Sequence, residues 1–330
     1  MTHSISIIVP AHEDGEFLRR CLAGIAGMSP QAAEVILVED GAGDSTRSLA
    51  RKFGYRWLNN PSGRGPARAR NLGASHAEGD LLFFIDSDVI VRPDASAQVQ
   101  RVFTDDPELR AVIGSYDDEP AAGNFTSQYK NLFHHYIHQH SEEAASTFWG
   151  ACGAIDRKVF LDIGGFDEHY RRPCIEDIEF GSRLTRAGFR IRLCKALQCK
   201  HLKRWSFASL LKTDLLDRAV PWTELILRDH KLINDLNLRP SSRISVVLLF
   251  ASLGLLAAGF WKLESAAIGL ILLLAVLAIN LPVYQFFFAK RGLWFMIRAV
   301  LWHCIYYLCC GLGFALGLGR ALLHRARIFF

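Results

Sequence analysis

Two closely spaced acidic residues follow an apolar run in the first third of the chain. Asp86 and Asp88 come directly after residues 81–85 (LLFFI) and are separated by one serine. Mg²⁺ typically takes one or two protein carboxylates together with phosphate oxygens of a substrate. The pair therefore predicts a divalent-cation site, with an ordinary turn as the alternative, because Asp and Ser are common turn formers.

Other carboxylates occur in similar positions. Asp40 ends the apolar run 35–38 and precedes two glycines, so it could accept hydrogen bonds from a base or a ribose hydroxyl. Glu176 and Asp177 stand at the start of a segment with helical spacing. Because a helix dipole favours acidic residues there, a purely structural role is the alternative for this second pair.

Arginines gather around a predicted helix start. Arg64, Arg68 and Arg70 surround Gly65-Pro66, and Pro is favoured at the first helical position. A helix N-terminus and guanidinium groups both bind anions. This segment predicts an anion site, and the alternative is a solvated basic helix face.

The elements that must position these residues alternate between strands and helices. This pattern predicts a parallel, doubly wound α/β sheet with helices on both faces, in which ligands bind at the carboxyl ends of the strands. We expect strands at residues 4–9, 35–38, 55–58 and 81–85, and helices at residues 17–26, 45–53 and 66–77.

The C-terminal part of the chain is strongly apolar. Residues 244–261 and 265–289 lack charged side chains, and each is about as long as a membrane span requires. Asn280 and Pro282 are candidates for a kink in the second segment. The third segment, 293–319, is interrupted by Arg298 and His303, so two to three transmembrane helices are expected. One arrangement is an interfacial stretch at 294–302 before a span at 304–318.

Residues 205–243 connect these two parts. Amphipathic helices at 207–216 and 222–233 are expected either to lie on the membrane or to pack on the preceding domain. Basic residues flank the apolar segments on one side, and the positive-inside rule then places residues 1–243 in the cytoplasm. We thus expect an α/β domain at 1–204, interfacial helices at 205–243 and a transmembrane region at 244–330.

Five segments, in this order, resemble glycosyltransferase family 2 over about residues 4–205: IIVPAHED, VEDGAGDST, ARARNLGASHAEGDLLFFIDSDV, GGFDE and IEDIEFGSRLTRAGF. The resemblance implies a GT-A fold, a Rossmann-like α/β domain with a doubly wound mixed sheet, here followed by C-terminal transmembrane helices. It also implies a nucleotide-diphosphate sugar donor, usually a UDP-sugar, and Mg²⁺ or Mn²⁺ as cofactor.

The same resemblance implies roles for individual residues on the donor side. The donor-binding positions begin with the strand end Pro10, Ala11, His12 and Glu13, which corresponds to the nucleoside wall. Asp40 corresponds to the carboxylate that recognises the base, and Arg70 to a position near the nucleotide. Asp86 corresponds to a ribose or metal contact.

On the reaction side, Asp88 corresponds to the metal ligand, beside Asp86, and Asp177 to the general base that deprotonates the acceptor hydroxyl. Glu176 lies on the acceptor or diphosphate side of this base. Attack from the face opposite the leaving nucleotide would invert the configuration at the anomeric carbon.

The segment His201-Leu-Lys-Arg204-Trp205 is similar to the QxxRW motif of processive family members, with His in place of Gln. By that match Arg204 contacts the diphosphate, Trp205 lines the acceptor site and His201 contacts the metal or a phosphate. The alternative is a cluster at the membrane boundary, which suits Trp and Arg side chains.

These observations together predict an integral protein of the plasma or inner membrane that transfers one sugar to a membrane-associated acceptor, such as a glycolipid or polyprenyl-linked saccharide. A processive polysaccharide synthase or a polyprenyl-phosphate glycosyltransferase is the alternative. The hydrophobic content of 50% excludes a disordered chain. The net charge of +5 suits membrane lipids or phosphates, and no nucleic-acid partner is expected.

Overall fold

The computed structural model describes residues 3–12, 15–41, 44–60, 65–230 and 236–328. The chain divides into two compact units, residues 1–204 and residues 205–330.

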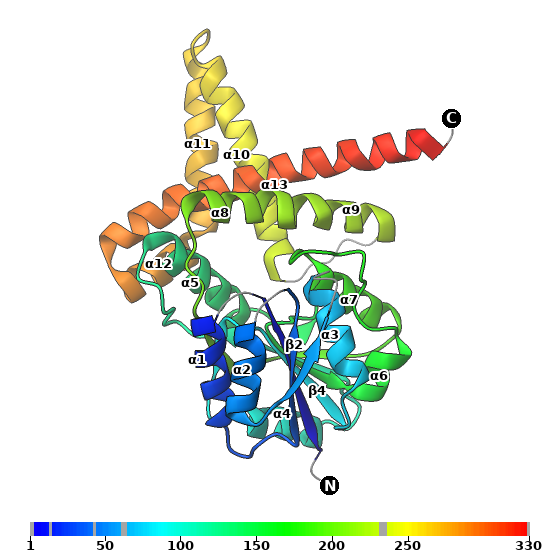
Figure 1. Ribbon diagram of the computed structural model, residues 1–330. Helices are drawn as coiled ribbons and strands as arrows, with labels where there is room; N and C mark the ends of the chain where they lie inside the picture. Colours follow the sequence, from blue (N-terminus) through cyan, green and yellow to red (C-terminus); the bar gives the residue numbers. More distant parts are fainter. Residues whose placement is uncertain (1–2, 13–14, 42–43, 61–64, 231–235, 329–330) are drawn as a thin grey trace. The chain divides into compact units, whose positions relative to one another are not determined.

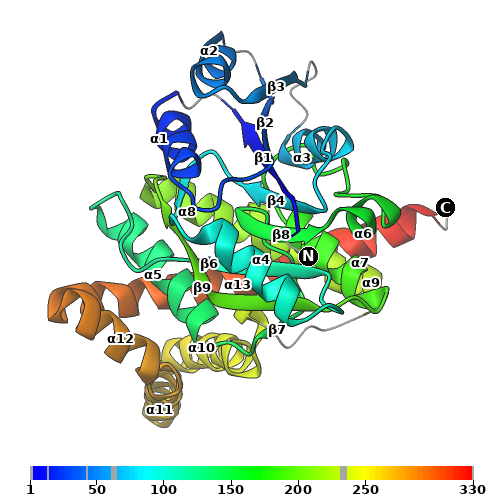
Figure 2. The same ribbon diagram turned by 90° about the horizontal axis from the view of Figure 1, so that it is seen from below.

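The first unit is built around a sheet that has nine strands within the described residues, in the order β3-β2-β1-β4-β8-β6-β9-β5, with β7 paired to β9. Figure 2 shows this order, from β3 and β2 through β1, β4 and β8 to β6 and β9. The strands are β1 (Ile5–Ala11), β2 (Glu34–Glu39), β3 (Arg56–Asn59), β4 (Leu81–Ile85), β5 (Val89–Val91), β6 (Ala111–Tyr116), β7 (Ala144–Ala145), β8 (Cys152–Asp156) and β9 (Ile191–His201).

Helices cover both faces of this sheet. In Figure 1, α1 and α2 lie on one side of β2 and β4, and α3, α6 and α7 lie on the other. The helices of this unit are α1 (Gly15–Ala26), α2 (Asp44–Phe53), α3 (Pro66–Ser75), α4 (Ala95–Asp105), α5 (Phe125–Gln139), α6 (Arg157–Asp162) and α7 (Glu176–Arg186).

The sheet is mixed, as the family resemblance implies. Strands β3, β2, β1 and β4 are parallel, with Ile8 of β1 opposite Ile36 and Phe84. The expectation of a purely parallel sheet holds only for this half, because β8 runs antiparallel to β4 and β6, and β5 runs antiparallel to β9. The apolar runs that predicted strands all lie within residues 4–85. The strands that bring antiparallel pairing into the sheet come later in the chain.

An aromatic core lies between the sheet and the helices on the α6–α7 side. Phe84 of β4 contacts Phe166, with ring centroids 5.3 Å apart, and Phe166 contacts Phe180 of α7 at 4.8 Å. Phe148 and Phe160 complete this core, and all five rings are buried. Because large aromatic rings pack in few orientations, the core fixes the start of α7 relative to the end of β4.

The second unit begins with one continuous helical stretch. It consists of α8 (Phe207–Lys212), a π-helical segment (Thr213–Ala219) and α9 (Val220–Asp229). Ser206 caps it, because its hydroxyl accepts a hydrogen bond of 3.1 Å from the Ser209 N–H. The sequence predicts two separate amphipathic helices here, whereas the π-helical turn joins them without a break.

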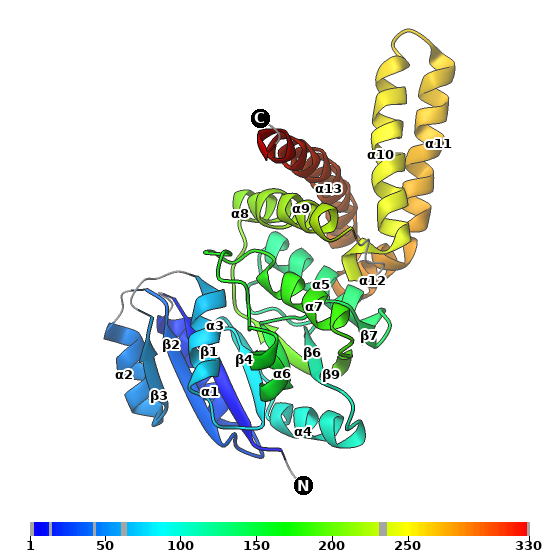
Figure 3. The ribbon, with the colours of Figure 1, turned by 90° about the vertical axis from the view of Figure 1, so that its right-hand side faces the viewer.

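The remaining helices are α10 (Pro240–Ala258), α11 (Leu263–Ile279), α12 (Leu281–Arg291) and α13 (Leu293–Ile328), after a short 3₁₀ turn at Leu236–Leu238. Figure 3 shows α10 and α11 side by side. Ser252 donates to the carbonyl oxygen of Gly269 at 2.7 Å, and Gly269 leaves room for Leu256 of the facing helix. Small residues thus allow close helix contact, as is common in membrane proteins.

Among the described residues, two helices are long and apolar enough to cross a membrane, α10 and the Leu293–Leu323 part of α13. The bent pair α11–α12 counts as a third if it crosses as one span. This pair bends by 59° at Asn280, where the sequence predicts a kink. The third apolar segment differs from the expected arrangement, since α13 is one helix of 36 residues. Its His303 is buried against the Tyr307 ring at 4.5 Å, so this polar residue does not interrupt the helix.

Candidate active site

The carboxyl ends of the four parallel strands meet at one edge of the sheet. Ala11 is opposite Glu39, and Glu39 is opposite Asn59, so β1, β2 and β3 end together. Pro10 and Ala11 are buried at the end of β1, and the Ala11 carbonyl accepts a hydrogen bond of 2.8 Å from the Asp40 N–H. This edge therefore carries the residues predicted to contact the nucleoside, as far as the structure describes them.

Asp40 is buried at this edge and is held from two sides. The Asn60 side-chain amide donates to Asp40 Oδ1 at 2.8 Å, and His12 Nδ1 hydrogen-bonds to the Asp40 carbonyl oxygen. A Cβ at Gly41, whose φ is +137°, would lie 2.6 Å from His12 Nδ1, so only glycine permits this approach. The Asp40 carboxylate is thus fixed in orientation at the end of β2.

Asn60 is a site residue that sequence reasoning missed. It follows β3 in the same way that Asp40 follows β2, and a polar residue after a strand is the signal that could have identified it. Glu13, also predicted at this edge, and Arg64, predicted for the anion site, lie outside the described residues.

Arg70 connects the end of β4 with the start of α7. Its side chain is 4% exposed and donates to Asp86 Oδ1 at 2.6 Å and to Glu176 Oε1 at 3.0 Å. The second oxygen of Glu176 accepts a hydrogen bond of 2.9 Å from the Cys174 N–H. Three segments that are far apart in the sequence therefore converge on one guanidinium.

Burial and charge oppose each other in this cluster. Burial raises the pKa of Asp86 although the charge of Arg70 opposes the shift. Burial also disfavours the charged form of Arg70, but the carboxylates of Asp86 and Glu176 outweigh it and raise the pKa of the guanidinium. Arg70 therefore stays charged and is oriented towards two carboxylates.

Asp88 lies beside His201, the last residue of β9. The register pairs Val89 with His201, and Asp88 Oδ2 lies 3.5 Å from His201 Nε2. Burial disfavours the charged form of Asp88, but the hydrogen bond and charge of His201, together with Lys203, outweigh burial and lower the pKa of the carboxyl. Asp88 is therefore a carboxylate at neutral pH.

Asp177 lies at the first turn of α7 and faces the segment before β8. Its Oδ2 accepts a hydrogen bond of 3.3 Å from the Gly150 N–H, and its Oδ1 accepts one of 2.8 Å from the Ile178 N–H. A Cβ at Gly150 would lie 2.9 Å from Arg70 Cζ. Gly150 therefore contacts both the predicted base and the arginine that holds Asp86 and Glu176.

A third acid of α7 and two predicted residues have different surroundings. Glu179 pairs with Arg183 at 2.9 Å, and Arg183 also donates to the Gly165 carbonyl, so this acid stabilises the turn that contains Gly165. Arg204 is exposed at the end of the first unit, and Trp205 is buried at the start of the second.

The chemistry of Asp88 and His201 fits a divalent cation. Among the residues that the structure describes, no three or more Asp, Glu, His or Cys side chains form a group that could hold a metal ion. A carboxylate oxygen and an imidazole nitrogen together suit Mn²⁺, and Mg²⁺ completes its shell with waters and phosphates. The pair therefore fits a cation shared with a phosphorylated ligand.

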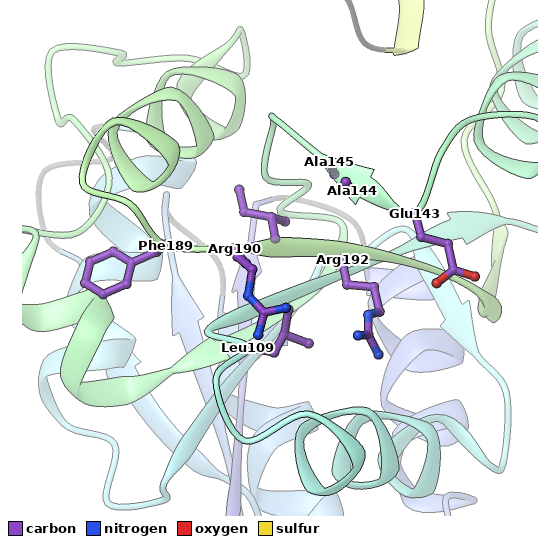
Figure 4. A pocket seen from close by; sticks show the side chains of 8 residues that line it. Leu109, Glu143, Ala144, Ala145, Phe189, Arg190 and Arg192 are labelled. Atoms are coloured by element: carbon purple, nitrogen blue, oxygen red, sulfur yellow. The ribbon is translucent and has the colours of Figure 1, made fainter.

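A separate cavity of about 370 Å³ lies at the opposite edge of the sheet, where β6 and β9 begin (Figure 4). Arg190 and Arg192 line it, and Asp106 accepts a hydrogen bond of 2.7 Å from each of them. None of the predicted site residues lines this cavity. The chemistry-bearing cluster is thus distinct from it.

Comparisons with known proteins support the family that the sequence motifs resemble. Residues 6–164 match the model of Glycosyl transferase family 2, and residues 131–205 match that of the N-terminal domain of galactosyltransferase.

The glycosyltransferase GlyG of Streptococcus pneumoniae serotype 4 is 33% identical over 132 residues, which cover 38% of this chain and 43% of that protein. The poly-beta-1,6-N-acetyl-D-glucosamine synthase of Staphylococcus aureus is 24% identical over 238 residues, 68% of this chain and 56% of that protein. The chain spans about half the length of these curated relatives.

Two solved structures share the fold. The mannosyltransferase PcManGT from Pyrobaculum calidifontis, in complex with GDP-Man and Mn²⁺, has a TM-score of 0.62 at 19% identity and covers 92% of this chain and 87% of its own. GalNAc-T7 with UDP, GalNAc and Mn²⁺ has a TM-score of 0.51 at 15% identity, over 68% of this chain and 48% of its own. The chain therefore carries a glycosyltransferase family 2 domain with the GT-A fold.

Proposed function

We propose that the protein is an inverting, metal-dependent glycosyltransferase that transfers a sugar from a nucleotide-diphosphate sugar, a UDP-sugar, to a membrane-associated acceptor. One observation carries this proposal: Arg70 joins Asp86 to Glu176, and Gly150 lies between Arg70 and Asp177. A predicted donor-side carboxylate and the predicted base thus belong to one cluster.

On the donor side, Pro10, Ala11 and His12 line the nucleoside, and the Asp40 carboxylate accepts hydrogen bonds from the base. The fixed orientation of Asp40 by Asn60 supports this role, because a rigid acceptor discriminates between bases. Nucleotides in both structural neighbours, GDP-Man and UDP, support a nucleotide-linked donor.

Asp88, Asp86 and His201 hold Mg²⁺ or Mn²⁺ in this proposal. His201 and Lys203 lower the pKa of Asp88, which supports its role, since a metal ligand must be deprotonated. When bound, the cation stabilises negative charge on the departing diphosphate. Arg70 keeps Asp86 in place through its 2.6 Å contact.

Asp177 accepts the proton of the acceptor hydroxyl, whose oxygen attacks the anomeric carbon opposite the nucleotide. The bond from that carbon to the diphosphate oxygen breaks, and the product has inverted configuration. Glu176, Arg204 and Trp205 are assigned to the acceptor or diphosphate side. The half-buried position of Asp177, with Gly150 N–H as one partner, supports a base that is oriented before substrate arrives.

The acceptor in this proposal is a glycolipid or a polyprenyl-linked saccharide. The apolar helices α10 and α13 support membrane association. Arg239 directly precedes α10, and Arg243 lies in its first turn. Lys290 and Arg291 end α12. By the positive-inside rule, these basic residues support a catalytic unit on the cytoplasmic side.

The test uses the full chain in detergent with a panel of nucleotide-sugars, with and without Mn²⁺. We expect one donor to raise the melting temperature only with Mn²⁺, and to yield a nucleoside diphosphate and a glycosylated lipid. Asp88→Ala should abolish both effects, whereas Asp106→Asn, which alters the distant cavity, should retain them. Release of a sugar 1-phosphate instead, with the nucleotidyl group transferred to the acceptor, would identify a nucleotidyltransferase.

A processive polysaccharide synthase is a second candidate, favoured by the relative that synthesises poly-beta-1,6-N-acetyl-D-glucosamine. His201 occupies the place of Gln in the motif of processive enzymes, which supports transfer of a single sugar. Product length decides between the two: mass spectrometry should detect one added sugar per acceptor, and a polymer would establish the second candidate.

A further inference from the structure

The imidazole of His201 is held between an acidic residue and an aromatic ring. Its Nε2 faces Asp88 at 3.5 Å, and its ring stacks on Tyr116, with centroids 4.4 Å apart and planes 15° from parallel. Tyr116 is the last residue of β6. Such a parallel stack restricts rotation of the imidazole about its side-chain bonds, so the ring of Tyr116 influences where Nε2 points.

Tyr116 is itself fixed from several directions. The ring of Trp149 meets it edge-on at 4.9 Å, and the ring of His134 lies at 4.5 Å. The Tyr116 carbonyl accepts a hydrogen bond of 2.7 Å from His135 Nδ1 on α5. Backbone and side chain are both restrained, so Tyr116 can act as a rigid support.

An irregularity of the sheet brings Tyr116 to His201. The register between β6 and β9 shifts between Ile113 and Ser115, after which Tyr116 lies opposite Cys199. Because side chains alternate along a strand, Cys199 and His201 point to the same face. Without this bulge, a different residue of β9 would face Tyr116.

The aromatic contacts extend from His201 towards the predicted base. Trp149, which meets Tyr116, directly precedes Gly150, and the Gly150 N–H donates to Asp177. Tyr116 therefore touches both the side chain assigned to the metal and the segment that orients the base.

We propose that Tyr116 is a positioning residue of the metal site, whose ring holds His201 so that Nε2 faces Asp88, a role that rests on the proposed function. Tyr116 is assigned no contact with the cation. Loss of a residue that orients a metal ligand typically costs about 10–100-fold in metal affinity.

The test measures the dissociation constant of Mn²⁺ alone for the full chain in detergent, by electron paramagnetic resonance of the free ion. We expect Tyr116→Leu to weaken Mn²⁺ binding about 10–100-fold. Tyr116→Phe keeps the ring and should bind Mn²⁺ as the wild type does. Tyr116→Met, which refills the volume without a planar ring, replaces Tyr116→Leu if that variant does not fold, with the same expected loss.

A matched control comes from a second tyrosine–histidine stack in the same unit. Tyr136 packs on His140 with centroids 4.1 Å apart and planes 22° from parallel. Tyr136→Leu removes the same kind of contact at the residue that directly follows His135 on α5, and should leave Mn²⁺ affinity unchanged. An equal loss in this control would mean that general packing, and not orientation of His201, determines metal affinity.

The two levels of the proposal fail in different ways. If Asp88→Ala abolishes Mn²⁺ binding while Tyr116→Leu and Tyr116→Met bind as tightly as the wild type, the role of Tyr116 is overturned and the metal site stands. If Asp88→Ala binds Mn²⁺ as tightly as the wild type, the metal site of the proposed function is wrong, and the role of Tyr116 is wrong with it.

Discussion

The guanidinium of Arg70 donates a hydrogen bond of 3.0 Å to Glu176, a residue 106 positions later in the chain. Both side chains are almost fully buried, at 4% and 6% exposure. A buried ion pair contributes little net stability compared with apolar residues of the same size, but loss of one partner leaves a buried charge without compensation. Arg70 therefore ties the first half of the catalytic unit to α7.

Substitution of Arg70 should destabilise the first unit strongly. For Arg70→Met we expect the free energy of unfolding to fall by about 3–5 kcal/mol, because Glu176 stays buried without its partner. Denaturant titration of the full chain, followed by a spectroscopic probe in the first unit, measures this change. The double variant Arg70→Met/Glu176→Gln should recover part of the loss, since the buried charge is then removed.

An exposed ion pair provides the matched control. Arg19 pairs with Glu16 at 2.7 Å on the surface of α1. Arg19→Met should leave the denaturation midpoint nearly unchanged, because exposed pairs are screened by water. Equal effects of Arg70→Met and Arg19→Met would show that the buried pair has no special role.

Removal of the proposed base should lower the rate without weakening donor binding. For Asp177→Asn we expect turnover to fall about 10²–10⁴-fold, since a positioned base contributes that much. Donor affinity, measured by calorimetry, should stay within the wild-type range. Asp162→Asn, an exposed acid on α6, serves as the control and should keep full activity. An active Asp177→Asn would assign the base to another residue.

The local pattern of the sequence was sufficient for the first part of the fold. Residues 81–85 are predicted as a strand and form β4 with the same bounds, because a short apolar run that precedes an acidic turn has few alternatives. Asp40 and Asp86 lie at the predicted edge for the same reason. The pairing of Arg70 with Glu176 could not be predicted, because it depends on packing of the distant aromatic core.

The second unit shows where local patterns fail. The charged Arg298 and the polar His303 suggested a break in the third apolar segment, yet α13 continues through both. Hydropathy does not reveal that His303 is buried by tyrosines. The bend at Asn280 was predictable, because Pro282 follows at once and removes a backbone donor.

Asp80 should make the stability of the first unit depend on pH in the acid range. Its Oδ2 accepts hydrogen bonds of 2.8 Å from Ser4 N–H and 2.7 Å from Ser4 Oγ–H, and these bonds lower the pKa of the carboxyl below its ordinary value of 3.8. An acid with a depressed pKa in the folded state stabilises the protein above its unfolded pKa. This stabilisation is lost as the pH falls through the folded-state pKa.

The difference in unfolding free energy between the wild type and Asp80→Asn measures this contribution. It should be constant from pH 7 to about pH 5, and it should shrink below the ordinary pKa of 3.8. Ser4→Ala, which keeps only the backbone donor, should show a smaller pH dependence. A difference that persists unchanged at pH 3 would contradict the assignment.

Asn280 should stabilise the bend between α11 and α12 through its side chain. Asn280 Nδ2 donates to Ser245 Oγ at 2.9 Å, and Tyr307 OH donates to Asn280 Oδ1 at 2.7 Å. Hydrogen bonds between membrane helices contribute about 0.6 kcal/mol on average and up to about 1.7 kcal/mol. Tyr307→Phe should therefore lower stability in detergent by about 1 kcal/mol.

A double-mutant cycle with Asn280→Leu isolates this contact. The effects of Tyr307→Phe and Asn280→Leu should not add, because each removes the same hydrogen bond. Strict additivity would mean that the two side chains do not interact in the folded protein.

Gly313 of α13 should tolerate no side chain, because it packs against the helix that carries Ala219. A Cβ at this position would overlap the Ala219 side chain, whereas a Cβ at Gly254 of α10 would meet nothing within 4 Å. Alanine favours a helix over glycine by up to about 1 kcal/mol. Gly254→Ala should therefore raise the melting temperature in detergent slightly, whereas Gly313→Ala should lower it, since overpacking typically costs about 1–3 kcal/mol.

Limited proteolysis of residues 213–229 should also accelerate only in Gly313→Ala, as that segment separates from α13. Equal behaviour of the two variants would mean that α13 and the π-helical segment do not pack together in the folded protein.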